Sequence, residues 1–194
     1  MLRTLFIAMF YELHTRSAFS FLSSGSQPQR LAARAAELGM SGAALIDRDT
    51  VAGAVRFHFE AKAHGIKPII GAELTMEDGS LLPLVPMDLR GYQNLSKLIT
   101  IIKLRNKKGE HFATRKDIEE YSASLLCFTG GADGFMHNSV KNGRGQIDLA
   151  WLNYVFEKRL YIELQRHHLR SEEAINQALL GLSHKLCVPY FASN

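Results

Sequence analysis

The chain has 194 residues, of which 46% are hydrophobic and 22% are charged, and its formal net charge is +4. This length and composition suit one domain with a substantial core and exclude disordered and collagen-like classes. The positive charge is compatible with a nucleic-acid partner but is too small to indicate one. No apolar stretch approaches the ~20 residues of a membrane-spanning helix, so we expect no membrane partner.

The opening segment, MLRTLFIAMFYEL, has one arginine and a short apolar run, which superficially resembles a signal peptide. The run lacks a cleavage motif of small residues and continues directly into YELH, so a first strand with its lead-in is the favoured interpretation. Cys127 and Cys187 each lie within an apolar run. We therefore expect two buried free thiols and a cytoplasmic location.

The first helix has a recognisable start and end. Ser26 is expected as its N-cap, because Gln29 follows three residues later as in a capping box and Pro28 suits a first turn. Helical periodicity then runs over 30–38, and Gly39 is expected to end the helix.

Apolar runs and helical periodicity alternate along the rest of the chain. Strands are predicted at 42–47, 67–74, 80–85, 124–130, 159–164 and 188–193, and helices at 51–64 (with Gly65 just past its end), 91–105, 149–156 and 171–186. Nearly continuous apolar strands followed by helices indicate a parallel sheet that helices cover on its outer side. This predicts an α/β fold, with an incomplete or small barrel as the leading architecture. A flat doubly wound sheet is the alternative, but no glycine-rich phosphate fingerprint follows the first strand.

Polar residues at the ends of the predicted strands carry most of the functional information. In a parallel barrel such residues gather at one mouth. They are His14, Thr15, Arg16, Ser17, Asp47, Arg48, Asp49, Glu73, Thr129, Gly130, Gly131, Glu163, Gln165, His167 and His168. One such residue is usually structural, but several that converge form the default candidate active site.

The stretch YELHTRSAFSFLSSGSQPQRLAARAAELGMSGAALIDRDTVAGAVRFHFEAKAHGIKPIIGAEL resembles the start of the PHP (polymerase and histidinol phosphatase) domain of bacterial C-family DNA polymerases, especially the error-prone type. The likeness continues through DGSLLPLVPMDLRGYQNLSKLIT, LLCFTGGADG and YIELQRHH to PYFASN, and so covers essentially the whole chain. It implies a distorted, (β/α)7-like, TIM-barrel-like PHP barrel that is truncated after its last strand. It also implies that 1–194 is a single PHP domain and a fragment of a longer polymerase chain.

The resemblance further implies a mouth at which active members hold a metal cluster with histidines and carboxylates. This sequence departs from that pattern at Arg16 and Arg48 (histidine in the family), Ser23 (an acidic residue), Leu81 (histidine) and Gly131 (cysteine or histidine). The final Asp-x-His pair of the family would fall beyond Asn194. His14, Asp47 and Glu73 remain as candidate metal ligands.

Metal chemistry indicates what these departures mean. Arginine stays protonated and has no lone pair to donate, so Arg16 and Arg48 cannot bind a metal ion. A catalytic site with a metal-activated water needs about three protein ligands and an open position. We therefore expect a degenerate site with no cofactor, or at most one weakly bound zinc, manganese or magnesium ion. The two arginines are expected either to supply counter-charge to Asp47, Asp49 or Glu73, or to point to solvent.

These expectations lead to one function and two rivals. The favoured function is the N-terminal PHP domain of an error-prone DNA polymerase III alpha-subunit-like protein, with no catalytic residue of its own. It would support DNA synthesis by the remaining polymerase domains, and would meet DNA only through them. The first rival is a metal-dependent phosphoesterase or 3′–5′ proofreading exonuclease that uses His14, Asp47 and Glu73. The second is independent nucleic-acid binding, against which the modest net charge of +4 argues. The basic run 103–116 is favoured as a solvated loop, with a phosphate-backbone contact or a docking surface in a parent polymerase as the alternative.

Overall fold

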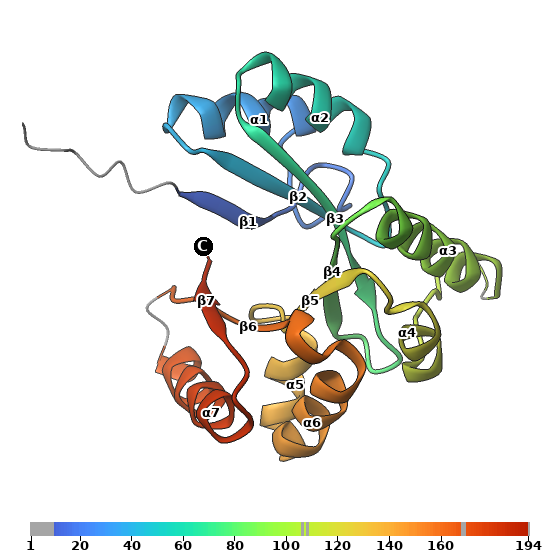
Figure 1. Cartoon of the computed structure of the whole chain (residues 1–194), viewed down its shortest axis with the longest axis vertical. Helices are drawn as coiled ribbons and strands as arrows, with labels where there is room; N and C mark the ends of the chain where they lie inside the picture. The colour runs from blue at the N-terminus through green and yellow to red at the C-terminus, as the bar shows by residue number, and fades with distance from the viewer. Residues whose placement is uncertain (1–9, 106, 108, 168–169, 194) are drawn as a thin grey trace, which may run out of the picture.

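The computed structural model describes residues 10–105, 107, 109–167 and 170–193. These residues form one curled sheet, a half barrel, in the strand order β1-β2-β3-β4-β5-β6-β7 (Figure 1). The strands are β1 (Tyr11–Thr15), β2 (Gly42–Arg48), β3 (Lys67–Thr75), β4 (Leu81–Pro86), β5 (Leu125–Phe128), β6 (Leu160–Leu164) and β7 (Tyr190–Ala192). The helices are α1 (Pro28–Glu37), α2 (Ala54–Ala63), α3 (Leu89–Arg105), α4 (Arg115–Tyr121), α5 (Phe135–Lys141), α6 (Gly145–Phe156) and α7 (Arg170–Leu186). The predicted α/β fold and incomplete barrel are confirmed.

The sheet is not uniformly parallel, contrary to the prediction. β4 runs antiparallel to both β3 and β5, whereas the other neighbouring pairs are parallel. The short link 76–80 explains the difference, because a parallel crossover needs about a dozen residues and a tight turn does not. Gly79 has a φ of +80° in this link, a conformation that glycine adopts without strain. The turn therefore lies at the end of β3 where the functional side chains gather.

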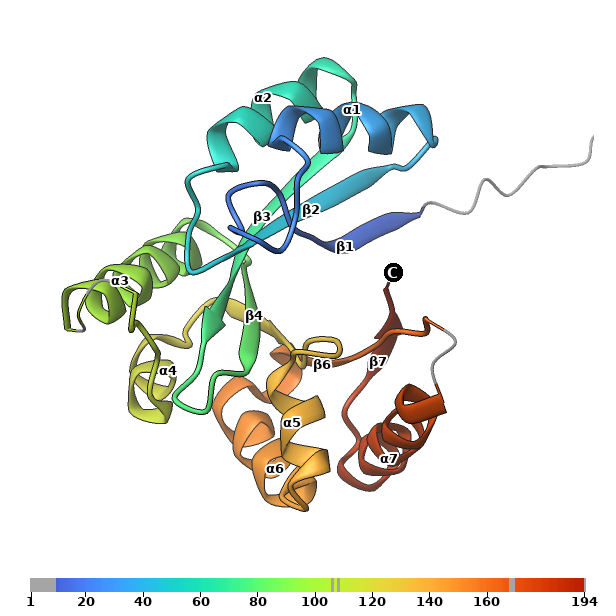
Figure 2. The ribbon, with the colours of Figure 1, turned by 180° about the vertical axis from the view of Figure 1, so that it is seen from behind.

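The helices cover the outer face of the curled sheet, as both views show (Figures 1 and 2). β2 illustrates how the sequence produces this layering. Ala43 and Leu45 pack in one cluster with Phe57 of α2, whereas the alternate residues Ala44 and Ile46 pack on the opposite, inner face. Side chains alternate between the faces of a strand, so an unbroken apolar run buries both faces.

The ends of the first two helices were partly predictable. Gly39 and Gly65 follow α1 and α2 with φ values of +71° and +72°, as expected. Ser26 is not the N-cap of α1, because the helix begins at Pro28 and Gln27 takes the cap position without a side-chain hydrogen bond. The Ser26 carbonyl instead accepts a hydrogen bond from the Ala18 amide, which closes the loop between β1 and α1.

Described residues at both ends of the basic run 103–116 belong to helices and make contacts, rather than forming only the predicted solvated loop. Thr114 and Asp117 form a reciprocal capping box at the start of α4, a helix that the periodicity did not reveal. Arg105 makes a two-pronged contact with Asp117, at 2.7 and 2.6 Å. The guanidinium of Arg105 therefore forms an ion pair that connects α3 to α4.

The two cysteines differ from each other. Cys127 is buried, as expected, but Cys187 is exposed, because it follows the end of α7 with a φ of +52°. Within the described ranges, no helix is both long enough and apolar enough to span a membrane. The predicted lead-in to the first strand lies mostly outside the described residues, as does His168.

Candidate functional site

His14, at the end of β1, lies between two glutamates from distant strands. Its Nδ1 atom is 2.8 Å from Oε1 of Glu163 on β6, and its Nε2 atom is 3.1 Å from Oε2 of Glu73 on β3. All three residues are buried. The mouth of the half barrel therefore holds an imidazole that two carboxylates contact from opposite sides.

The charges in this cluster follow from its geometry. Burial opposes protonation of His14, but the hydrogen bonds to Glu163 and Glu73 outweigh burial and raise the pKa of His14 to about 9. Burial also opposes ionisation of Glu163, yet the His14 contact lowers the pKa of Glu163 below its ordinary value. The raised pKa favours the imidazolium form of His14, in which both ring nitrogens donate to the carboxylates.

Arg16 lies directly against Glu73. Its Nη2 atom donates to Oε2 at 2.8 Å, and its Nε atom is 2.6 Å from Oε1. The second contact is a close ion pair that lacks the alignment of a hydrogen bond. Nη1 of Arg16 is also 3.8 Å from Oδ2 of Asp133. A fixed positive charge therefore covers the carboxylate that was a candidate metal ligand.

Asp47, at the end of β2, faces the loop that follows β1. Its carboxylate accepts hydrogen bonds from the Ser17 amide and hydroxyl, both at 2.7 Å, and from the Ser20 hydroxyl at 2.6 Å. Among the described residues, no hydrogen bond or ion pair joins Asp47 to His14 or Glu73. The structure thus brings two of the three candidate ligands together and holds the third in a separate hydrogen-bond set.

Arg48 and Asp49 lie at the rim. Asp49 accepts hydrogen bonds from the amide and hydroxyl of Thr75, at 2.8 and 2.6 Å. The Nε atom of Arg48 donates to the Thr75 hydroxyl at 3.2 Å and is 3.9 Å from Asp49. The Arg48 side chain is 43% exposed. Arg48 is therefore only loosely paired, unlike Arg16.

Gln165 takes up the space beside Gly131. A Cβ atom added at Gly131 would lie 1.8 Å from Oε1 of Gln165. The Gln165 amide donates to Glu163 at 3.1 Å and to Ser193 at 3.3 Å, and Ser193 also donates to Glu163. Sequence reasoning found Gln165 as a strand-end residue but missed this relationship. In the sequence, the only sign of this packing was Gly131 itself, at a position where the family is expected to have a cysteine or histidine.

The remaining strand-end residues have local partners. Thr129 accepts a hydrogen bond from the amide of Glu163 at 2.9 Å. His167 contacts Glu172 at 2.8 Å rather than the His14 cluster. Glu12 was not predicted; it accepts from the His14 amide at 3.1 Å, and burial raises its pKa. Leu81 is buried.

Comparison with known proteins establishes the family. The family profile described as the PHP domain matches residues 12–167. The chain belongs to the PHP domain family. The error-prone DNA polymerase of Pseudomonas aeruginosa is 34% identical over 183 residues, which are 94% of this chain and 17% of that relative. The DNA polymerase III subunit alpha of Borreliella burgdorferi is 31% identical over 206 residues, with 97% of this chain and 18% of that relative covered. The PHP chain thus spans under a fifth of the length of these relatives.

Solved structures agree on the fold. A protein from Bifidobacterium adolescentis assigned as a metal-dependent phosphoesterase has a TM-score of 0.62 at 15% identity, covering 96% of this chain and 87% of that one. The lesion-specific endonuclease EndoQ of Pyrococcus furiosus has a TM-score of 0.52 at 14% identity, covering 94% of this chain and 47% of that one. At these identities the likeness shows a shared fold.

The side chains at the mouth of this PHP domain are engaged with one another. Arg16 covers Glu73, His14 lies between two carboxylates, and Asp47 accepts three hydrogen bonds from Ser17 and Ser20. Within the described part of the chain, no group of three or more His, Cys, Asp or Glu side chains is arranged to hold a metal ion. The ion pairs of the mouth do, however, link β1 to β3 and β6.

Proposed function

We propose that this PHP domain, over residues 1–194, is the N-terminal module of an error-prone polymerase of the alpha-subunit type, and that its role is structural. The similarity to polymerase chains over 94–97% of the domain supports this parent. The parent would be a cytoplasmic DNA-directed DNA polymerase. The domain's partners would be the remaining polymerase regions, and DNA would reach it only through them.

The observation that carries the structural role is the contact of Arg16 with Glu73. The guanidinium lies 2.8 and 2.6 Å from the two carboxylate oxygens. In related domains a second histidine is expected at this position, where it would bind a cation. Arginine instead supplies the positive charge itself, so the carboxylate is neutralised without a metal. Arg16 therefore replaces a metal bridge between strand ends with a side-chain ion pair.

The test measures metal content and hydrolysis in the purified chain. After incubation with zinc, manganese or magnesium and dialysis, we expect far less than one equivalent of metal by elemental analysis. We also expect no turnover of a chromogenic phosphate ester. A stoichiometric metal with turnover that His14→Ala abolishes would instead support the phosphoesterase or exonuclease reading with His14, Asp47 and Glu73.

A variant tests the counter-charge role of the two arginines. The double variant Arg16→His/Arg48→His removes both fixed cations from the rim. We expect it to lose stability, because the carboxylate of Glu73 keeps only its contact with His14 and two imidazoles do not supply a permanent charge at neutral pH. Tight zinc or manganese uptake by this variant with undiminished stability would contradict the proposal.

A further inference from the structure

α6 turns an apolar face toward solvent. Its sequence, GQIDLAWLNYVF, contains one charged residue, Asp148, and that residue is buried. The outward side of the helix carries Ile147, Ala150, Trp151 and Tyr154, at the i, i+3, i+4 and i+7 spacing of one helical face. Ile147 is 69% exposed and Tyr154 is 82% exposed. A helix that is apolar on all sides is ordinarily covered on all sides, so these four residues, the α6 face, are expected to have a partner.

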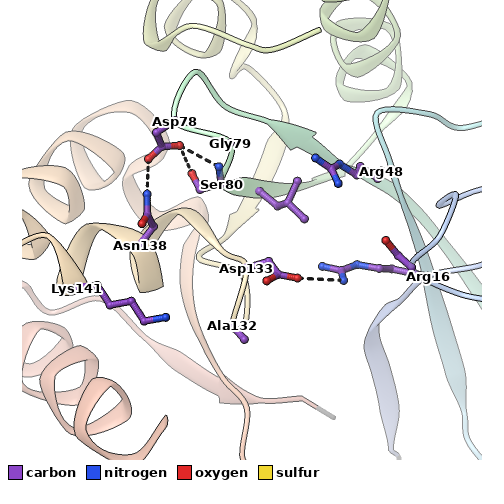
Figure 3. Close-up of a pocket in the computed structure, with 11 residues that line it drawn as sticks. Arg16, Arg48, Asp78, Gly79, Ser80, Ala132, Asp133, Asn138 and Lys141 are labelled. Carbon is purple, nitrogen blue, oxygen red and sulfur yellow. Dashed lines mark hydrogen bonds and ion pairs between the residues drawn. The ribbon is translucent and has the colours of Figure 1, made fainter. Parts of the chain in front are cut away.

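The α6 face is separate from the mouth of the barrel. α6 belongs to the outer helical layer (Figures 1 and 2). Among the described residues, none from α6 lines the cavity at the mouth, to which α5 contributes Asn138 and Lys141 (Figure 3). An inference drawn from the α6 face therefore does not depend on the His14 cluster or on the proposed function.

We propose that the α6 face binds the α6 face of a second copy of this chain, with the two helices antiparallel about a two-fold axis. The axis passes through the midpoint of the face, so Ile147 of each copy meets Tyr154 of the other. Ala150, the smallest of the four side chains, meets the large side chain of Trp151. A small residue at the midpoint lets the two helices approach closely, so the face is complementary to itself in size.

Charge complementarity at the two ends of α6 favours the antiparallel direction. Lys185 lies beside the first turn of the helix, because its Nζ atom donates to Oε1 of Gln146 at 2.9 Å. Glu157 follows the last turn and is exposed. An antiparallel pair brings Lys185 of each copy to Glu157 of the other, whereas a parallel pair brings like ends together. Lys158, the cation next to Glu157, is exposed and free to extend into solvent.

Trp151 is ordered before the two copies meet. Its Nε1 atom donates to Oε1 of Glu119 at 2.7 Å, and the guanidinium carbon of Arg115 lies 4.5 Å from a ring centroid of the indole. A side chain that is already held in place loses little conformational entropy on association. The face is nevertheless small, so the dimer should be weak, with a dissociation constant on the order of tens of micromolar.

The experiment is sedimentation of the 194-residue chain at protein concentrations from about 5 to 500 µM. The average mass should rise from that of one chain toward that of two. A chain that stays monomeric over this range would overturn the proposal and assign the face to a different occupant. Association beyond the dimer would also overturn it, because a two-fold pairing closes on itself.

A matched pair of substitutions locates the interface. Ala150→Glu places like charges at the midpoint of both faces and should weaken association by about tenfold or more. Ala63→Glu is the control, because Ala63 is an exposed alanine at the end of α2, and it should associate as the unmodified chain does. Circular dichroism and thermal unfolding should report an intact fold for both variants. Equal association of the Ala150→Glu variant and the unmodified chain would overturn the proposal.

Charge reversal tests the antiparallel direction. Lys185→Glu and Glu157→Lys should each weaken association by a factor on the order of 2–5, because each places like charges together at both ends of the pair. The double variant Lys185→Glu/Glu157→Lys should recover the association of the unmodified chain, since both ion pairs form again with their signs exchanged. A double variant that associates no better than the single variants would overturn the antiparallel pairing.

Discussion

The Nδ1 atom of His14 lies 2.8 Å from Oε1 of Glu163, although 149 positions separate the two residues in the sequence. His14 is on β1, at one edge of the curled sheet, and Glu163 is on β6, beside the opposite edge strand. No strand pairing joins β1 to β6 or β7 in the described part of the chain. This buried contact therefore links the two sides of the half barrel through side chains alone.

The first prediction concerns the pH dependence of stability. The folded-state pKa of His14 is about 9, above its ordinary value of 6.5. The folded protein therefore binds the His14 proton more tightly than the unfolded chain does. This stabilises the fold fully below about pH 6.5, and the stabilisation is lost as pH rises through 9. Urea unfolding should therefore show a decline on the order of 1–3 kcal/mol over this range. His14→Gln should remove the decline, whereas His64→Gln, at an exposed surface pair, should retain it.

The second prediction concerns the ion pair of Arg16 with Glu73. Arg16→Met should lower the free energy of unfolding by about 1–3 kcal/mol, less than for a fully buried pair because the Arg16 side chain is 27% exposed. Arg34→Ala is the matched control, since it breaks an exposed pair with Glu37, and it should cost about 0.5 kcal/mol or less. In a double-mutant cycle with Glu73→Gln, the two losses should not add. Additive losses would show that the pair contributes no coupling.

The third prediction separates a structural Asp47 from a metal-binding one. Asp47→Asn replaces one carboxylate oxygen, which accepts hydrogen bonds, with an NH₂ group, which donates them. This NH₂ group would face the Ser17 amide and the hydroxyls of Ser17 and Ser20, which also donate. We expect a loss of about 1–3 kcal/mol in urea unfolding. Asp133→Asn, at an exposed position, should change stability little. An unchanged stability of Asp47→Asn together with a fall in metal uptake would assign Asp47 to metal binding instead.

The fourth prediction concerns the space that Gln165 takes up. Gly131→Ala should displace the end of Gln165 and cost about 1–2 kcal/mol through its lost hydrogen bonds to Glu163 and Ser193. In a Gln165→Ala background the same substitution should cost clearly less, as thermal and urea unfolding would report. Gly25→Ala is the control, because a Cβ there meets nothing within 4 Å. Equal costs in both backgrounds would show that Gln165 is not the obstacle.

Much of the fold could be predicted because it depends on local patterns. Unbroken apolar runs such as 42–47 indicated strands buried on both faces, and Gly39 and Gly65 marked helix ends through their backbone freedom. The antiparallel β4 was missed, although the shortness of the link 76–80 was visible in the sequence. The short helices α4 and α5 were missed because each is too brief for a clear period.

The site was less predictable, since its contacts depend on tertiary structure. Strand-end position correctly brought His14 and Glu73 to one mouth. Position could not reveal that Asp47 bonds to the serines of the neighbouring loop, or that Glu163 holds the other side of the His14 ring. Both contacts depend on the rotamer that each side chain adopts in the folded barrel, and the sequence pattern does not specify rotamers.

The filled space beside Gly131 constrains how this domain could evolve. Any larger side chain introduced at Gly131 would meet the end of Gln165. The end of Gln165 would have to leave its hydrogen bonds to Glu163 and Ser193 to make room. The identities of residues 131 and 165 are therefore coupled, and each position limits what the other can accept.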